Sequence, residues 1–227
     1  MTALRDPDVL RSDDLLERLQ RRFAQPLPGP LVHRRFAHEL SFGRHSGPPP
    51  ADARDAAVLV LLYPADEQWH LPLLLRPTGM AAHGGQVAFP GGMAERGETP
   101  EQCAAREAQE ELGIDPARLN FLGRLTPLYI YASNFRVTVC VAGTSVRPAF
   151  RPDASEVAEL LQLPVEELWN DQRIGRHAIL RQGVQFEVPH LEFQGRRIWG
   201  ATRMMLGELQ CLLDDVRYAN DECVTNA

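Results

Sequence analysis

The stretch from residue 92 to residue 114 constrains the fold more than any other part of this chain, because a glycine turn leads there into a short helix with clear ends. Thr99 is a favourable N-cap, Pro100 occupies the first helical position, and Gln102 lies three residues past the cap, as in a capping box. Gly113 follows the last residue of the periodic pattern and ends it. We therefore expect a helix between Thr99 and Gly113.

Two sides of this helix differ in chemistry. Glu107, Glu110 and Glu111 share one side at spacings of three and four residues. Like charges one turn apart destabilise a helix by about 0.2–0.5 kcal/mol per pair, and carboxylates near the C-terminal end also oppose the helix dipole. Another side carries small apolar residues at four-residue intervals, which favours close packing on a sheet: Ala104, Ala108 and Leu112.

A bound divalent cation explains the acidic side of the helix. Clustered carboxylates are typical ligands of Mg²⁺ or Mn²⁺, hard ions that also bind phosphate oxygens. A solvated acidic face is the alternative, and the cluster alone leaves both interpretations open.

The spacing of the whole stretch resembles the Nudix box. The matching positions are Gly92, Glu98, the pair Arg106-Glu107, the pair Glu110-Glu111, Gly113 and the aliphatic residue Ile114. This resemblance implies a loop-helix-loop that holds Mg²⁺ or Mn²⁺ against a diphosphate linkage. It also implies the metal ligands: the carbonyl of Gly92 and the carboxylates of Glu107, Glu110 and Glu111.

Three further catalytic candidates follow from the resemblance. We expect Arg106 to hold the loop carboxylate of Glu98 and to help orient Glu107. Related enzymes also use one more carboxylate from a distal loop. Glu156 is our choice for it, with Glu159 and Asp153 as competitors.

The segment before the box resembles the coenzyme A pyrophosphatase branch of the Nudix enzymes. Leu73–Gly92 contains an arginine after a leucine-rich stretch, followed by His-Gly-Gly-Gln-Val-Ala-Phe-Pro-Gly-Gly. Ala81-Ala82 stand where this branch has a leucine-arginine pair. Arg76 is suited to bind a phosphate, although an ordinary surface arginine is the alternative. His83 and Gln86 are candidate substrate contacts, and a structural role for the histidine is the alternative.

A second match to the same branch lies far downstream. Ile198–Thr202 reads Ile-Trp-Gly-Ala-Thr and resembles the segment that opens the last helix of those proteins. We expect Trp199 to support the wall of a substrate pocket beyond the diphosphate. The histidine-containing segment at His83–Phe89 would line the same pocket nearer to the diphosphate.

The order of elements predicts an α/β fold with a mixed β-sheet between helices, and the resemblance implies that this is a Nudix-type α/β/α sandwich. We expect an N-terminal helical arm with a proline-rich linker at residues 1–53, a Nudix hydrolase domain at 54–215 and a C-terminal tail at 216–227. We expect helices at 12–24, 165–169 and 201–213. We expect strands at 56–63, 71–75, 87–89, 119–131, 135–141, 184–191 and 196–199. Residues 156–163 have features of both a strand and a helix, and we favour a strand there.

Charge and composition exclude several classes of protein. The formal net charge of −6 gives no electrostatic reason to expect nucleic-acid binding. The longest apolar runs, such as 56–63, are too short to span a bilayer, and the acidic first residues do not resemble a signal peptide. The four cysteines form no CxxC pair. We therefore expect a cytoplasmic protein that does not bind membranes, and a homodimer is plausible.

The two resemblances together imply a metal-dependent Nudix pyrophosphohydrolase that cleaves coenzyme A or its thioesters to 3′,5′-ADP and 4′-phosphopantetheine or its acylated form. The first alternative is hydrolysis of ADP-ribose or another nucleoside diphosphate derivative. The second is a non-catalytic Nudix-fold binding module, which would be expected to have lost acids of the box.

Overall fold

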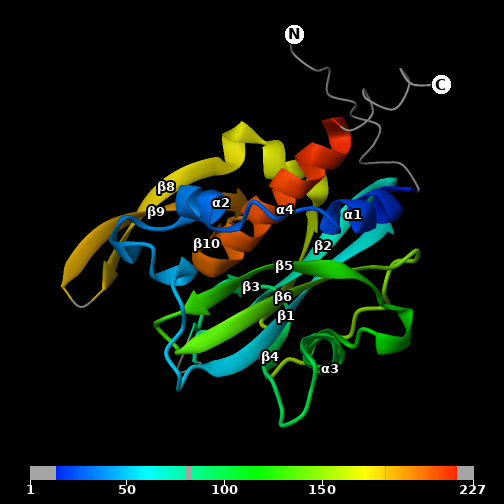
Figure 1. Ribbon diagram of the computed structural model, residues 1–227, viewed down its shortest axis with the longest axis horizontal. Coiled ribbons are helices and arrows are strands. Elements are labelled where there is room, and N and C mark those ends of the chain that lie inside the picture. Colours follow the sequence, from blue (N-terminus) through cyan, green and yellow to red (C-terminus); the bar gives the residue numbers. More distant parts are fainter. Residues whose placement is uncertain (1–13, 80–82, 182, 219–227) are drawn as a thin grey trace.

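The computed structural model of this protein describes residues 14–79, 83–181 and 183–218. Its largest element is a seven-stranded sheet in the order β3-β2-β1-β6-β5, in which β4 pairs with β1 and β7 with β2 (Figure 1). The pairing of β1 with β6 is parallel and the other pairings are antiparallel, so the sheet is mixed. The strands are β1 (Arg54–Ala65), β2 (Gln68–Leu75), β3 (Val87–Ala88), β4 (Gly91–Met93), β5 (Asn120–Ile130), β6 (Phe135–Gly143) and β7 (Glu159–Pro164).

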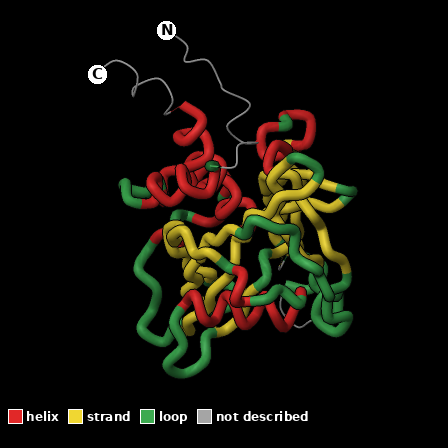
Figure 2. Tube along the Cα trace, turned by 90° about the vertical axis from the view of Figure 1, so that its right-hand side faces the viewer, coloured by secondary structure: helices red, strands yellow, loops and turns green. Residues whose placement is uncertain are grey.

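Helices cover both faces of this sheet, which confirms the predicted α/β/α sandwich. Helix α3 (Pro100–Leu112) lies on one face, and α1 (Leu15–Phe23), α2 (Gly29–Phe36) and α4 (Gly200–Tyr218) lie on the other (Figure 1). The same three layers are visible from the side in Figure 2. Each layer boundary has its own apolar core, one with α3 and one with α1 and α4.

Strand β1 contributes side chains to both cores. Leu59 and Leu61 belong to the core beneath α3, and Val60 and Leu62 belong to the opposite core. Successive side chains of a strand point to opposite faces, so a strand covered on both sides needs apolar residues at every position. This explains why the sequence shows a continuous apolar run there.

A second, three-stranded sheet follows in the order β10-β9-β8. Its strands are β8 (Ile174–Arg181), β9 (Val184–Phe193) and β10 (Arg196–Trp199). The predicted hairpin of the last two strands is confirmed, whereas β8 was not predicted. As an edge strand, β8 has no fully buried side chain, so its sequence lacks a clear apolar pattern.

The N-terminal helices pack on the main core. The predicted first helix is confirmed as α1, and its Leu15 and Leu19 are fully buried against α4 and β5. Side chains on α1 come so close to the strands that a Cβ at Gly123 or Gly143 would overlap them. Helix α2 was not predicted because prolines suggested a break, although proline is well tolerated in a first turn. The boundary at residue 53 stays a prediction.

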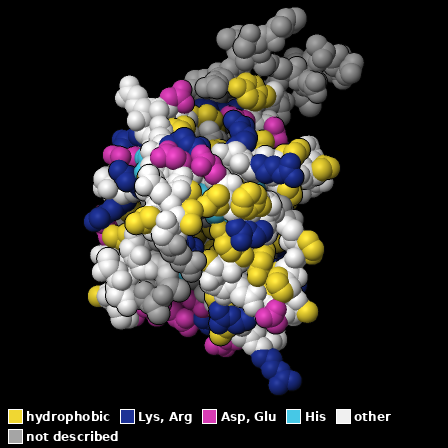
Figure 3. Space-filling model, turned by 90° about the vertical axis from the view of Figure 1, so that its left-hand side faces the viewer, with side chains coloured by type: hydrophobic (Ala, Val, Ile, Leu, Met, Phe, Trp, Pro, Cys, Tyr) yellow, Lys and Arg dark blue, Asp and Glu magenta, His cyan; other side chains and the backbone are white. Residues whose placement is uncertain are grey.

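Helix α4 continues past the predicted end at Leu213 to Tyr218. Residues 216–218 of the predicted tail are therefore helical, and 219–227 lie outside the described residues. Within the described ranges, no helix combines the length and the apolar character needed to cross a membrane. On the face drawn in Figure 3, basic side chains are interspersed with acidic and apolar ones.

Candidate active site

Helix α3 has the ends that its sequence predicts. The backbone N–H of Gln102 donates to the Thr99 hydroxyl (3.3 Å), and the Thr99 N–H donates to the Gln102 side-chain oxygen (2.8 Å). At the other end, Gly113 adopts a left-handed conformation with φ of 69°. The helix is thereby fixed in register, and with it the direction of its three glutamates.

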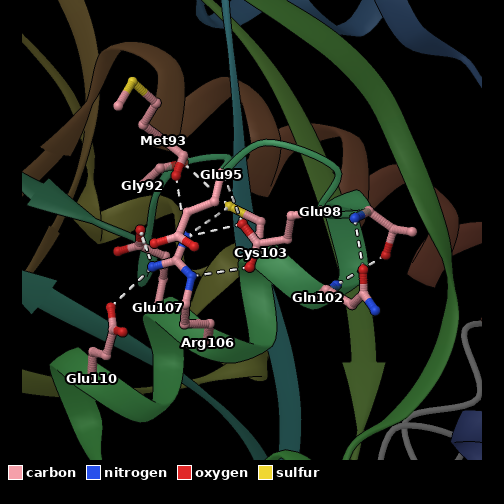
Figure 4. Close-up of polar contacts among 10 residues, drawn as sticks. Gly92, Met93, Glu95, Glu98, Gln102, Cys103, Arg106, Glu107 and Glu110 are labelled. Carbon is pink, nitrogen blue, oxygen red and sulfur yellow. Dashed lines mark hydrogen bonds and ion pairs between the residues drawn. The ribbon is translucent and has the colours of Figure 1, made fainter.

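A single guanidinium organises the acids on and near α3. Arg106 donates through Nε and Nη2 to both oxygens of Glu98 (3.0 and 3.1 Å), through Nη2 to the Met93 carbonyl (3.1 Å) and through Nη1 to Glu107 (2.8 Å) and Glu110 (3.0 Å) (Figure 4). The predicted pairing of Arg106 with Glu98 is present. The arginine ties the loop to the helix and offsets repulsion between the two helix carboxylates.

Glu111 is the buried member of the acidic trio. Its side chain is only 1% exposed, and its Oε2 accepts a hydrogen bond from the Gly91 N–H (2.8 Å). Its Oε1 lies 3.7 Å from Nη1 of Arg76 and has no hydrogen-bond partner among the described residues. A buried carboxylate oxygen without a donor is costly, which marks this atom as available to a cation.

Two glycines allow this close approach. Gly91 has a φ of 154°, and a Cβ there would overlap the backbone of β1 at Ala57 and Val58. A Cβ at Gly92 would overlap the carboxyl group of Glu107. Glycine is therefore required at both positions for β4 to pass between β1 and α3.

Burial shifts the proton affinities of the two enclosed glutamates. Burial raises the pKa of Glu107 and raises that of Glu111 to about 7, and the charge of Glu156 adds to both rises. The pKa of Glu98 is instead lowered, first by its hydrogen bond from Arg106. Burial thus disfavours the charged form of Glu107 and Glu111 as long as no cation compensates their charge.

The structure distinguishes the three candidates for the distal carboxylate. Glu156 is the one whose charge reaches Glu107 and Glu111. Asp153 accepts hydrogen bonds from the backbone N–H and the hydroxyl of Ser155 (both 2.8 Å), and Glu159 forms an ion pair with Arg196 (2.8 Å). The loop is attached to the end of α3, since the Asp153 N–H donates to the Glu111 carbonyl (2.9 Å).

The loop between β2 and β3 carries three predicted substrate contacts. Its base is closed by backbone hydrogen bonds from Arg76 N–H to the Gln86 carbonyl and from Gly85 N–H to the Arg76 carbonyl (both 3.0 Å). Nδ1 of His83 lies 3.0 Å from the side-chain oxygen of Gln86; the histidine is exposed and the glutamine is half-buried. Arg76 reaches one acid of α3, Glu111, whereas the side chains of His83 and Gln86 contact each other. Ala81 and Ala82 lie outside the described residues.

The downstream segment meets this loop. The hydroxyl of Thr202 donates to the carbonyl of Val87 across 2.9 Å, and the bond is buried. Trp199 is half-buried on β10, beside the ring of His177 (5.9 Å between centroids), and His190 lies opposite it on β9. The two segments that resemble one enzyme branch are therefore neighbours in space.

The predicted metal ligands converge without forming a preformed cage. Among the described residues there is no group of three His, Cys, Asp or Glu side chains already arranged to hold a metal ion. Two of the acids are in ion pairs with Arg106, and the Gly92 carbonyl accepts a long hydrogen bond from the Cys103 thiol (3.6 Å). The oxygen donor set and the orphaned Oε1 of Glu111 nevertheless suit a hard divalent cation.

Two contributors to the site were not predicted as individual residues. The Gly91 N–H positions Glu111, and the Thr202 hydroxyl joins the two halves of the chain. The positive φ required of Gly91 leaves a trace in the sequence as a glycine pair. The Thr202 contact leaves none, because its partner is a backbone carbonyl 115 residues away.

Comparisons with known proteins place the sequence beside one family. The NUDIX domain profile matches residues 53–182. A Nudix hydrolase named NudL from Pectobacterium atrosepticum is 35% identical over 165 residues, which cover 71% of this chain and 84% of that protein. NudL from Yersinia pestis is 33% identical over 189 residues, covering 83% and 89%. The crystal structure of the Nudix hydrolase RenU from M. smegmatis is 24% identical, covers 52% of this chain and 74% of that one, and gives a TM-score of 0.45.

Proposed function

Because this chain belongs to the Nudix family and is a hydrolase of pyrophosphate bonds, we propose that its substrate is coenzyme A or an acyl-coenzyme A. Cleavage of the diphosphate would give 3′,5′-ADP and 4′-phosphopantetheine, acylated where the substrate was. The acids of the box are all present, which favours turnover over binding alone.

One observation supports this substrate above the others in the family. The hydrogen bond from Thr202 to Val87 holds together the two segments whose sequences resemble the coenzyme A branch. Both segments lie outside the box, which is shared by enzymes with many substrates. Their proximity is expected if both segments recognise the same part of one substrate. That part of the substrate would lie on the side of β3 away from α3.

Nudix hydrolases generally use divalent metal ions. We propose that Glu107, Glu110, Glu111 and the Gly92 carbonyl hold Mg²⁺ or Mn²⁺ here. Such an ion, when bound, neutralises charge on the diphosphate and lowers the pKa of an attacking water.

The remaining roles follow from the contacts of each side chain. Arg76 is near enough to Glu111 to bind the same phosphate that faces the acids, and its guanidinium suits phosphate geometry. Arg106 keeps Glu107 and Glu110 in position through its ion pairs with both carboxylates. Glu156 or a glutamate of α3 accepts the proton of the attacking water.

A substrate panel with products identified by mass tests the assignment. With Mg²⁺ or Mn²⁺, we expect kcat/KM for coenzyme A to exceed that for ADP-ribose at least about tenfold, roughly 1.4 kcal/mol in transition-state binding. Better turnover of ADP-ribose would refute the coenzyme A proposal. Binding without turnover of any substrate in the panel would favour a binding module.

The variant Trp199→Ala tests the predicted pocket wall. If the indole contacts substrate, the ratio between the two substrates should fall towards one while the fold is kept. Trp169→Ala is the matched control, since that half-buried indole donates to Asp214 (2.9 Å) near the C-terminal end of α4, whereas Trp199 directly precedes the N-terminal end. The control is expected to lower stability and leave the ratio unchanged.

A further inference from the structure

A cavity of about 340 Å³ lies beyond the C-terminal end of α3. One wall is the segment from Gly113 to Leu119, which follows the helix, and the other is the segment from Thr144 to Arg151, which follows β6. The acidic side chains of the candidate active site do not line this cavity. Its volume falls in the range of small-molecule sites.

The charge of the cavity is opposite to that of the chain. Three arginines line it, Arg118, Arg147 and Arg151, against the single acid Asp115. The excess is therefore two positive charges, in a protein with a formal net charge of −6. Such a local reversal of sign attracts anions.

These guanidinium groups are only weakly engaged within the protein. Arg118 lies 3.5 Å from Asp115 in a pair whose partners are both more than half exposed, and water screens such pairs. Arg147 donates to the neutral side-chain oxygen of Gln162 (2.8 Å). The guanidinium of Arg151 makes no hydrogen bond or ion pair with any residue the structure describes.

The end of a helix normally repels anions, because its last carbonyls carry partial negative charge. Here those carbonyls are occupied. The N–H groups of Gly113 and Ile114 donate to carbonyls of the last turn, and those of Arg151 and Asp153 donate to Leu112 (2.8 Å) and Glu111 (2.9 Å). The carbonyls of Gln109, Glu111 and Leu112 are thus capped, and the arginines are the main charges on the cavity wall.

We propose that this cavity binds a phosphorylated small molecule of about nucleotide size. Guanidinium groups match phosphate oxygens in charge and in hydrogen-bond geometry, and three of them suit a multiply charged ligand. The apolar side chains of Leu119, Val146 and Pro148 line the same cavity and offer a surface for the organic part of the ligand. This site is distinct from the one that holds the substrate diphosphate.

Binding is measured by isothermal titration calorimetry with AMP and with inorganic pyrophosphate, in EDTA and at constant ionic strength set with sodium chloride. We expect saturable binding of at least one probe, and a dissociation constant at least tenfold weaker in the Arg147→Ser/Arg151→Ser double variant. Arg151→Ser alone should weaken binding without loss of stability, since that guanidinium has no hydrogen-bond or ion-pair partner among the described residues. The exposed Arg34 on α2 supplies the control variant Arg34→Ser, which should bind as wild type.

The active-site variant Arg76→Ala separates the two sites. It should bind the probe as tightly as wild type, because the cavity lacks this residue, and the result does not depend on which substrate the enzyme cleaves. Binding that is lost in Arg76→Ala and kept in the double variant would assign the probe to the active site and refute the proposal. Failure of both probes to bind the wild-type protein would refute it as well.

Discussion

At the scale of single residues, Glu111 is the most strongly perturbed acid of the site. Burial raises its pKa to about 7, so the folded protein holds a proton that the unfolded chain releases near 4.5. A raised carboxyl pKa means that metal-free wild-type protein loses stability as pH rises between those two values. Each pKa unit corresponds to about 1.4 kcal/mol.

We therefore expect the free energy of unfolding of Glu111→Gln, relative to that of the wild type, to rise by on the order of 2–3 kcal/mol between pH 5 and pH 8. Urea unfolding in EDTA at both pH values measures this difference. Glu101→Gln on the same helix is the control, because a hydrogen bond from Arg124 lowers the pKa of Glu101, so this variant should not gain on the wild type as pH rises. A stability difference for Glu111→Gln that does not vary with pH would contradict the assignment.

Glu110 tests the metal site without disturbing the core. Its side chain is 57% exposed and pairs only with Arg106 among the contacts described. Because Glu110→Gln removes a proposed carboxylate ligand, we expect its turnover at saturating Mn²⁺ to fall at least about a hundredfold, with little change in melting temperature. Near wild-type rates in this variant, with Glu101→Gln also active, would count against a metal ligand at position 110.

The residues of the site were predictable to different degrees. Fixed spacing along one helix places Glu107, Glu110 and Glu111 together, and the arginine at position 106 can reach them by local geometry alone. The distal carboxylate could not be chosen in this way. Asp153, Glu156 and Glu159 lie within seven positions of one another, and their different partners, Ser155, the site and Arg196, come from tertiary contacts.

At the scale of elements, the sequence predicts helices and strands with a clear apolar pattern and misses those whose pattern is weak. Strand β1 and helix α3 have clear apolar patterns and clear ends. Strand β4 looked like a turn because its glycines are needed for close approach, yet it pairs with β1. Helix α2 and strand β8 were missed because proline and partial exposure weaken their patterns.

Helix α1 gives the prediction that belongs to this scale. Leu19 is fully buried between the helix and the main sheet, so Leu19→Ala should cost about 2–5 kcal/mol in the free energy of unfolding. Leu31 on α2 is 74% exposed, and Leu31→Ala should change stability by less than about 0.5 kcal/mol. Chemical denaturation measures both. A small effect at Leu19 would mean that the first helix is a dispensable arm after all.

At the scale of the whole molecule, one hydrogen bond joins the upstream loop to the last helix. Thr202→Val leaves the buried carbonyl of Val87 without its donor, which should cost about 1–3 kcal/mol in stability. If the two segments form one pocket wall, the preference for coenzyme A over ADP-ribose should shrink in parallel. Thr202→Ser keeps the hydroxyl and should restore the preference; an unchanged ratio in the valine variant would separate this contact from substrate choice.

The packing of the first helix on the last one also has a consequence for synthesis on the ribosome. Leu15 and Leu19 of α1 are covered by α4, and Arg22 forms an ion pair with Asp215 (2.7 Å) near the far end of the chain. At about 5–20 residues per second, the partner of residue 22 is polymerised roughly 10–40 s later. During that interval the apolar side of α1 can pack on β5 but lacks its cover by α4, so part of the nascent core stays exposed until α4 leaves the exit tunnel.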